Sequence, residues 1–446
     1  MGDANGAAAT ATTERVRRRV VVIGGGFAGI NAAQELAKLP VDVTLVDRKN
    51  YHTFQPLLYQ VALAVLSPAE IAQPIRSILS PHPNVEVLMD EAVGFELEER
   101  RVRLKSGAML EYDYLIVAAG STHSYFGHEE WATLAPGLKT VEDATEIRRR
   151  VLLAFELAER QMMEHGTHPP LQFVIVGGGP TGVELAGAIS DIARLYMRNN
   201  FRHIDTKQAQ VLILEGSPYI LAMYPADLQA KALQQLNALG VEVRTSAVVS
   251  DVQPGYVVVG GKERIDAVVT LWAAGVQASP LGRMLGAETD KKGCVLVDQY
   301  LNPKGHPEIF VCGDLAHVVE NGRQIPGVAQ PAIQMGTYAA RRIGSLVGHE
   351  AGSEGRDVKG FHYFDKGDMA TIGRKAAVAN IVWPFKAHWS GLMAWLAWLM
   401  VHVFFLIGFR NRLGVFRQWA WTYLTLHDGA RLITGSQELP GWKDEG

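Results

Sequence analysis

The chain has 446 residues, of which 48% are hydrophobic and 20% are charged, and its net charge is −3. That length allows two or three domains, and the balanced charge, without a basic stripe interleaved with aromatic residues, argues against a nucleic-acid partner. Cys294 and Cys312 lack the spacing of a CxxC pair or a metal site. Their spacing fits a reducing compartment and excludes a redox disulfide between neighbouring cysteines.

The first 17 residues are rich in alanine and threonine and end in basic residues. They lack the apolar segment of a secretory signal. We therefore expect residues 1–17 to form a disordered extension, with a short organellar transit peptide as the alternative.

A dinucleotide-binding pattern begins at residue 18. After an apolar β-branched run, Gly24, Gly26 and Gly29 stand in G-x-G-x-x-G spacing. The first glycine permits a tight turn, the second lets the backbone approach a pyrophosphate, and the third lets the helix pack on the strand. The helix N-terminus offers free N–H groups to the phosphates, and Asp47, ending the second predicted strand, is placed to bind ribose hydroxyls.

The same pattern recurs at Gly177, Gly179 and Gly182, and here Glu215 ends the next predicted strand. The interval up to Glu215 exceeds the usual ~20 residues, and we assign the excess to an extended helix through residues 192–204. A carboxylate in the position of a 2′-phosphate repels NADPH, so we predict a preference for NADH.

Two further strands, over residues 111–121 and 265–280, each contain Ala-Ala-Gly, where small residues let the chain pass close to a cofactor. A late apolar strand is followed by Gly313 and Asp314. The duplication implies two dinucleotides bound in tandem, or one duplicated ancestral domain.

Taken together, these motifs resemble those of the two-dinucleotide-binding flavoprotein reductases. Within that group, residues 51–62 (YHTFQPLLYQVA), 177–187 and 329–336 (AQPAIQMG) are similar to motifs of the type II NADH dehydrogenases, the single-chain NADH:quinone oxidoreductases. The resemblance covers about residues 18–435. It implies an α/β fold with two Rossmann-like domains, one for FAD and one for NADH, and a C-terminal helical membrane-anchoring region.

The resemblance also implies roles for individual residues. It places Glu184 near the flavin and makes Gln330 and Gln334 a quinone-site pair. It also implies that the backbone of Val93, at the end of a strand over residues 86–93, holds the adenine. The implied FAD site consists of Gly24, Gly25, Gly26, Phe27, Ala28, Gly29, Asp47, Arg48, His52, Gln55, Pro56, Val93, Ala119, Gly120, Gly313, Asp314, Ala329 and Gln330. The implied NADH site consists of Gly177, Gly178, Gly179, Pro180, Thr181, Gly182, Glu184, Glu215, Ala274 and Gly275.

Several of these residues also have plainer interpretations. Glu184 could simply stabilise the helix dipole, but among apolar neighbours its pKa would rise, which suits orienting nicotinamide or relaying protons. Gln330 and Gln334 share a helix face if Pro331 begins that helix, although two surface glutamines would have the same spacing. His52 could act toward FAD as a cation or as a hydrogen-bonding group, and for Cys312 we favour a structural role.

We expect the FAD domain to comprise residues 18–140 and 295–360, with the NADH domain at 141–294 between them. In the remaining part, residues 361–446, we expect a β-hairpin with its turn at residues 366–368. Residues 389–409 are uncharged and as one helix would be long enough to span a bilayer. The stripe of Trp395, Trp398 and His402, basic residues on both flanks, and a following helix with Val415, Trp419, Tyr423 and Leu426 on one face instead favour anchoring in the membrane plane. A membrane span and packing in a soluble core are the alternatives.

The sequence therefore predicts hydride transfer from NADH to FAD, followed by two-electron reduction of a membrane quinone (ubiquinone or menaquinone) without proton pumping. We expect the protein on the cytoplasmic face of the cell inner membrane, with a homodimer left open. The alternatives are a soluble NADH oxidase or electron-transfer-protein reductase, and a non-catalytic NADH-sensing flavoprotein. A sulfide:quinone reductase would need paired reactive cysteines.

Overall fold

The computed structural model describes residues 17–442 except 168–169, 351–357, 407–408 and 426–429, and it leaves out the side chains of 409–411 and 421–425. The expected N-terminal extension, up to residue 16, lies outside the described part. So do Leu426 and the side chain of Tyr423, which we expected on the last helix.

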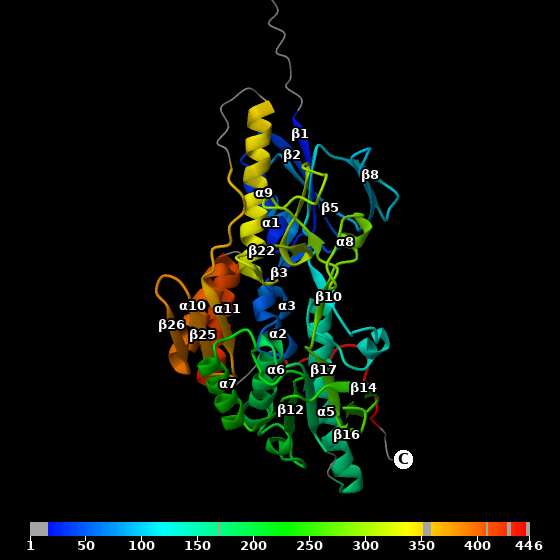
Figure 1. The fold of residues 1–446 in the computed structure, drawn as a ribbon. Coiled ribbons are helices and arrows are strands. Elements are labelled where there is room, and N and C mark those ends of the chain that lie inside the picture. Colours follow the sequence, from blue (N-terminus) through cyan, green and yellow to red (C-terminus); the bar gives the residue numbers. More distant parts are fainter. Residues whose placement is uncertain (1–16, 168–169, 351–357, 407–408, 426–429, 443–446) are drawn as a thin grey trace, which may run out of the picture.

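A five-stranded parallel sheet forms the core of the first domain, in the order β20-β9-β1-β2-β5. Its strands are almost continuous runs of Val, Ile and Leu, as expected for strands that helices cover on both faces. Figure 1 shows α1 and α9 lying together on this sheet. The elements are β1 (Arg18–Ile23), α1 (Phe27–Leu36), β2 (Val41–Asp47), α4 (Ile75–Leu79), β5 (Val85–Met89), β9 (Tyr114–Val117), β20 (Ile309–Val311) and α9 (Ala329–Glu350).

The second domain repeats this design around a four-stranded parallel sheet in the order β13-β12-β11-β17. Each sheet carries a three-stranded antiparallel meander beside it. The elements of this domain are α5 (Val141–His165), β11 (Gln172–Val176), α6 (Pro180–Asp191), β12 (Gln210–Leu214), α7 (Ala226–Ala238), β13 (Val241–Arg244), β14 (Val249–Gln253), β15 (Tyr256–Val259), β16 (Glu263–Asp266) and β17 (Val269–Trp272).

The chain crosses between the two domains at β10 (Ser121–His123) and β18 (Val276–Ala278), which pair antiparallel. Tyr125 and Trp131 already pack around Trp272 in the second domain, whereas Leu285 and Cys294 already belong to the core of the first. Both crossings therefore lie earlier in the chain than the expected boundaries at residues 140 and 295.

The first meander joins β6 (Ala92–Glu96), β7 (Arg101–Leu104) and β8 (Met109–Glu111). Val93 lies inside β6, at a bulge where the register shifts between Ala92 and Gly94. The expected single strand over residues 86–93 is wrong, because the chain leaves the parallel sheet after Met89 and enters the meander at Ala92.

A three-stranded antiparallel sheet follows α9, in the order β24-β25-β26. Its strands are β24 (Gly367–Thr371), β25 (Ala377–Ile381) and β26 (Ala387–Ser390). The hairpin exists, but its expected turn at residues 366–368 is wrong. Gly367, with φ +102°, begins β24, and the reversal occurs at residues 372–376, where Gly373 has φ +67°.

The last two helices are α10 (Leu392–Phe405) and α11 (Phe409–Thr425). Trp389 belongs to β26, so residues 389–409 do not form one helix. The 14 residues of α10 extend only about 21 Å. In the part of the chain that the structure describes, no helix combines the length and the apolarity needed to cross a bilayer.

Trp398 of the expected stripe faces the protein body, whereas Trp395 and His402 are partly buried. Trp398 and Trp419 are almost fully buried, and they pack in one core with Val415, with α5 and with the short helix α2 (Leu58–Ala62). This packing explains the mid-helix tryptophans without an interfacial location, so the stripe no longer supports membrane anchoring.

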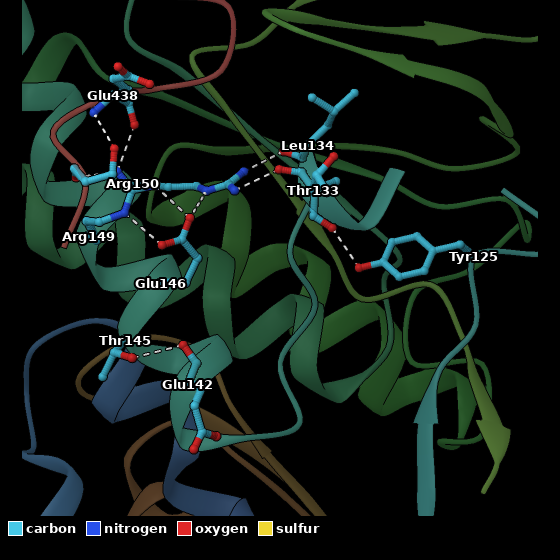
Figure 2. A network of polar contacts seen from close by, with 11 residues as sticks. Tyr125, Thr133, Leu134, Glu142, Thr145, Glu146, Arg149, Arg150 and Glu438 are labelled. Atoms are coloured by element: carbon cyan, nitrogen blue, oxygen red, sulfur yellow. Dashed lines mark hydrogen bonds and ion pairs between the residues drawn. The ribbon is translucent and has the colours of Figure 1, made fainter. Parts of the chain in front are cut away.

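The C-terminal strap, residues 430–442, returns from α11 to the second domain. Arg149 of α5 donates hydrogen bonds to the carbonyl oxygens of Ser436 and Glu438. Figure 2 shows Glu146 bridging Arg149 and Arg150, with Arg150 also bonded to the carbonyls of Thr133 and Leu134. The buried Arg149 thus fastens residues 436–438 to α5.

Candidate active site

The first glycine loop has the geometry of a dinucleotide cradle. Gly24 has φ +102°, and a Cβ there would lie 2.4 Å from the Ala118 carbonyl oxygen. A Cβ on Gly29 would lie 1.7 Å from the Gly24 carbonyl, so helix and strand meet too closely for any side chain. The carboxylate of Asp47 accepts hydrogen bonds from the Gly25 N–H at 2.6 Å and the Lys49 N–H at 2.7 Å.

The second glycine loop repeats this geometry. A Cβ on Gly182 would lie 1.9 Å from the Gly177 carbonyl oxygen. Glu215 accepts hydrogen bonds from the Gly178 N–H at 2.6 Å and the Ser217 N–H at 2.7 Å. Two acids therefore order two loops in the same way.

The expected long helix over residues 192–204 is wrong. Only Ile192–Tyr196 continue α6, as a π-helical turn, and the next helical residues are Thr206–Gln208. The extra residues before Glu215 form irregular chain, which leaves the acid in its place at the end of β12.

Asp314 lies just after β20, at the carboxyl edge of the first sheet. Its Oδ2 accepts a hydrogen bond from the Ser121 hydroxyl at 2.6 Å and lies 3.6 Å from Nζ of Lys139. Lys139 also donates to Ser121 at 2.9 Å. Ser121 and Lys139 were not anticipated from the sequence, although Ser121 directly follows the first Ala-Ala-Gly.

His52, in β3 (Tyr51–Thr53), is 3% exposed. Its Nδ1 lies 2.9 Å from the Gly25 carbonyl oxygen, so Nδ1 carries the hydrogen and Nε2 is an acceptor. No described residue pairs with the buried Nε2. Burial lowers the pKa of His52, opposed by the Gly25 carbonyl and Asp47, which favours the hydrogen-bonding interpretation over the cationic one.

This orphaned acceptor beside the first glycine loop fits a cofactor that brings a hydroxyl donor, as the sugar-like chain of FAD would. Phe27 packs edge-on against His52, with ring centroids 5.1 Å apart. Of the other residues predicted from the 48–56 segment, Pro56 is partly buried, whereas Arg48 and Gln55 are exposed.

Glu184 lies on α6 between the buried residues Val183 and Leu185, and it is itself partly accessible. Burial raises its pKa to about 8, with a partial offset from the backbone N–H of Thr371. Glu184 is thus a proton-carrying group near neutral pH. That property supports the proton-handling interpretation over a simple helix-dipole role.

A buried hydroxyl pair lies close to Glu184. The Tyr59 hydroxyl accepts hydrogen bonds from the Thr371 hydroxyl and from Nε2 of Gln60, both at 3.0 Å. Gln60 in turn accepts a hydrogen bond from the Trp419 indole at 2.7 Å. Burial, and to a lesser degree the charge of Glu184, raises the pKa of Tyr59, so this phenol stays protonated.

The two glutamines of α9 differ in what they bond. The helix begins at Ala329, so the condition that Pro331 be its first residue is not met. The Gln334 amide donates to the Phe364 carbonyl at 3.0 Å and accepts from the Phe364 N–H at 2.9 Å. Gln330 donates to the Gly367 carbonyl at 3.0 Å, but its buried Oε1 has no partner among the described residues.

The remaining predicted residues line the edges of the two glycine loops. Ala28 lies directly under α9, where a Cβ on Gly336 would approach its carbonyl oxygen to 2.1 Å. Ala274 and Gly275 follow β17, and the ring of Phe126, which the motifs missed, lies against Gly275. These positions are Gly26, Ala28, Ala119, Gly120, Gly313 and Ala329 around the first loop, and Gly179, Pro180, Thr181, Ala274 and Gly275 around the second.

Both cysteines are free and buried. Burial raises the pKa of Cys294 to about 11 and that of Cys312 further. Protonated, buried thiols are poor nucleophiles, which supports the structural interpretation of Cys312.

Comparison with known proteins agrees with this geometry. Residues 18–336 match the pyridine nucleotide-disulphide oxidoreductase family, and residues 366–428 match the NDH2 C-terminal domain. A type II NADH:quinone oxidoreductase of Mycobacterium tuberculosis, NdhA, is 43% identical over 430 residues, which cover 94% of this chain and 90% of that protein. An internal alternative NAD(P)H-ubiquinone oxidoreductase of Arabidopsis thaliana is 27% identical, over 94% of this chain and 87% of that protein.

Among solved structures, NDH2 from Plasmodium falciparum in complex with NADH aligns with a TM-score of 0.81 at 19% identity, covering 94% of this chain and 100% of that chain. At that identity the likeness shows the shared fold alone. The family match over residues 18–336 and the 43% identity to the mycobacterial protein carry the assignment further. The chain belongs to the type II NADH:quinone oxidoreductases, within the pyridine nucleotide-disulphide oxidoreductase family.

Proposed function

We propose that this protein binds NADH at the second glycine loop and FAD at the first, and passes two electrons to a quinone that it meets at a membrane surface. The observation that carries the proposal is the paired geometry of the loops. Each has an acid that accepts a hydrogen bond from the residue after its first glycine, Asp47 from Gly25 and Glu215 from Gly178. A single-dinucleotide enzyme would need only one.

When bound, FAD supplies the redox chemistry, taking a hydride from NADH and passing electrons to the quinone. The protein's side chains bind and orient the cofactor and handle protons. We assign the Ser121–Asp314–Lys139 group and the His52 acceptor to the cofactor's hydroxyl-bearing chain, because their hydrogen-bonding groups lie beside the first glycine loop and at the end of β20. Glu184, with its raised pKa, holds a proton at its carboxyl group that quinone reduction requires.

The C-terminal sheet connects the two halves of the site. Its first strand, β24, starts at Gly367, which accepts a hydrogen bond from Gln330, and ends at Thr371, which bonds Tyr59 beside Glu184. One strand therefore runs from the flavin-side glutamine to the proton-carrying glutamate. The NDH2 C-terminal region thereby completes the site as well as closing the fold.

A broad apolar face supports docking on a lipid surface. Met400 and Phe404 of α10 are 71% and 68% exposed. These two side chains lie one helical turn apart on the same face of α10, and exposed apolar surface of this kind marks an interaction site. Because α10 is too short to span, we assign docking in the membrane plane. The face comprises Leu392, Met393, Leu396, Met400, Val401, Phe404, Phe405, Leu413 and Phe416, with Trp383 and Phe385 of the adjacent sheet.

We assign the protein to the cytoplasmic face of the cell inner membrane, where NADH and a lipid-dissolved quinone are both within reach. A soluble NADH oxidase or electron-transfer-protein reductase would have no need for the apolar face. An NADH sensor would have no need for a quinone-reducing site. A sulfide:quinone reductase is disfavoured by the two buried thiols.

Vesicle flotation tests the docking. Replacing Met400 and Phe404 together by aspartate removes two side chains, each contributing about 1.5–3 kcal/mol when buried. We expect the double variant to lose vesicle binding while still reducing a water-soluble quinone. Met89→Asp is the control, because Met89 is 61% exposed and ends β5 in the parallel sheet of the first domain, outside α10 and α11. Unchanged flotation of the double variant would refute this docking surface.

A further inference from the structure

The two faces of α10 differ sharply in polarity and exposure. One face presents Met400 and Phe404 outward, while Trp398 is 2% exposed and packs inward. His402 lies one turn beyond Trp398 and is partly accessible. It is thus a polar side chain between the proposed lipid-facing surface and the protein interior.

The protonation pattern of His402 is fixed by its neighbour. Its ring stacks on Trp398 with centroids 4.1 Å apart, and Nδ1 lies 2.7 Å from the Trp398 carbonyl oxygen. A carbonyl only accepts, so Nδ1 carries the hydrogen and Nε2 has a free lone pair. No described residue bonds Nε2. Burial lowers the pKa of His402 to about 4, with a partial offset from the Trp398 carbonyl, so the ring is neutral and Nε2 accepts.

His402 is also linked to the first glycine loop through two aromatic contacts. It meets Phe54 edge-on at a centroid distance of 6.2 Å, and Phe54 meets Phe27, the first residue after the glycine turn, at 5.8 Å. On the same helix, the Phe405 ring lies 5.5 Å from Nζ of Lys366, which precedes the glycine that bonds Gln330. An acceptor at this place would face a head group moving between α10 and the flavin loop.

A quinone and its quinol differ in what they offer to such a group. A quinone presents only carbonyl acceptors, whereas the quinol presents hydroxyl donors. We propose that Nε2 of His402 accepts a hydrogen bond from a quinol hydroxyl, which makes His402 a positioning residue for the reduced form of the electron acceptor. This inference rests on the proposed quinone-reducing function, and it adds a residue and a direction of hydrogen bonding.

The test compares a short-chain quinol with its dimethyl ether, which lacks the hydroxyl donors. Their affinities for the FAD-loaded full-length protein in detergent are measured by calorimetry. We expect the wild type to bind the quinol about fivefold more tightly than the ether, as one neutral hydrogen bond would give. His402→Phe keeps an aromatic ring on Trp398 but has no acceptor, so this preference should disappear. His402→Gln, which retains an acceptor oxygen, should restore part of it.

The control is His388→Phe, because His388 is a histidine of β26 that pairs with Asp227, away from α10's inner face. Bound flavin and its reduction by NADH confirm that each variant is folded. The role of His402 would be overturned if His402→Phe and the wild type preferred the quinol over the ether equally. It would also be overturned if the wild type showed no such preference while NADH:quinone turnover persisted. Absence of turnover with every quinone would instead refute the proposed function.

Discussion

Glu215 accepts a hydrogen bond from the N–H of Gly178 at 2.6 Å, and its other oxygen accepts from Ser217. The carboxylate is therefore held in position before any nucleotide binds, with its negative charge at the end of β12. We predict that Glu215→Gln lowers the preference for NADH over NADPH about tenfold, since repulsion of a 2′-phosphate is lost. The ratio of kcat/KM for the two nucleotides measures this.

Asp47→Asn is the matched control for Glu215, because Asp47 bonds Gly25 in the same way at the other loop. We expect it to weaken FAD retention and to leave the NADH-to-NADPH ratio unchanged. If Asp47→Asn altered the ratio and Glu215→Gln did not, the assignment of the two loops would be reversed.

The loops were predictable because their determinants are local: each glycine and its acid belong to one strand-turn-helix-strand unit. The surroundings of Glu184 were not predictable in the same way. Thr371 reaches Tyr59 across 312 positions of sequence, and Trp419 reaches Gln60 across 359. No periodicity encodes such contacts, because they depend on how the C-terminal sheet docks against the first two domains.

The α10 segment shows the limit of hydropathy. Its composition permits a long apolar helix, but Gly391, with φ +69°, lets Trp389 pair in β26 before the helix starts. Trp398 then packs inward, in one hydrophobic core with residues of α2, α5 and α11. Tertiary packing decided both points.

Glu184 should make activity depend on pH. Its carboxyl group is protonated below its raised pKa of about 8, so we expect quinone reduction to fall as the pH rises through that value. Glu184→Gln should lower kcat by about tenfold or more and flatten this limb, because the amide cannot release a proton. The pH profile of kcat with saturating NADH and quinone provides the measurement.

The free energy of unfolding should also depend on the ionisation of Glu184, in a direction that follows from its raised pKa. A carboxyl whose pKa is raised by folding stabilises the fold most below its unfolded pKa, and that advantage is lost as the pH rises toward about 8. Relative to Glu184→Gln, the wild type should therefore become progressively less stable between about pH 4.5 and 8. Parallel urea midpoints over this range would contradict the assigned pKa.

The two glutamines of α9 should behave differently when truncated. Both ends of the Gln334 amide bond the Phe364 backbone, while Oε1 of Gln330 is buried without a described partner. We expect Gln330→Leu to raise KM for quinone or to weaken FAD retention severalfold. Gln334→Leu should mainly destabilise, by about 0.5–1.5 kcal/mol. A larger kinetic defect in Gln334→Leu would restore it to the quinone site.

Arg149 should hold the C-terminal strap in place. Its guanidinium bonds Glu146 and the carbonyl oxygens of Ser436 and Glu438, and its side chain is 7% exposed. Figure 2 shows Arg149 with Glu146 and Glu438. Arg149→Leu would leave both carbonyls without this donor, although Glu146 keeps Arg150, and the unsatisfied groups cost about 1–3 kcal/mol. We expect earlier proteolysis of residues 430–442 and a lower urea midpoint. The control is Arg244→Leu, which removes exposed ion pairs with Glu242 and Glu263 and should cost under about 1 kcal/mol. Equal losses in the two variants would mean that the strap is held by other contacts, of which the close packing of Gly441 on Gly255 is the strongest candidate.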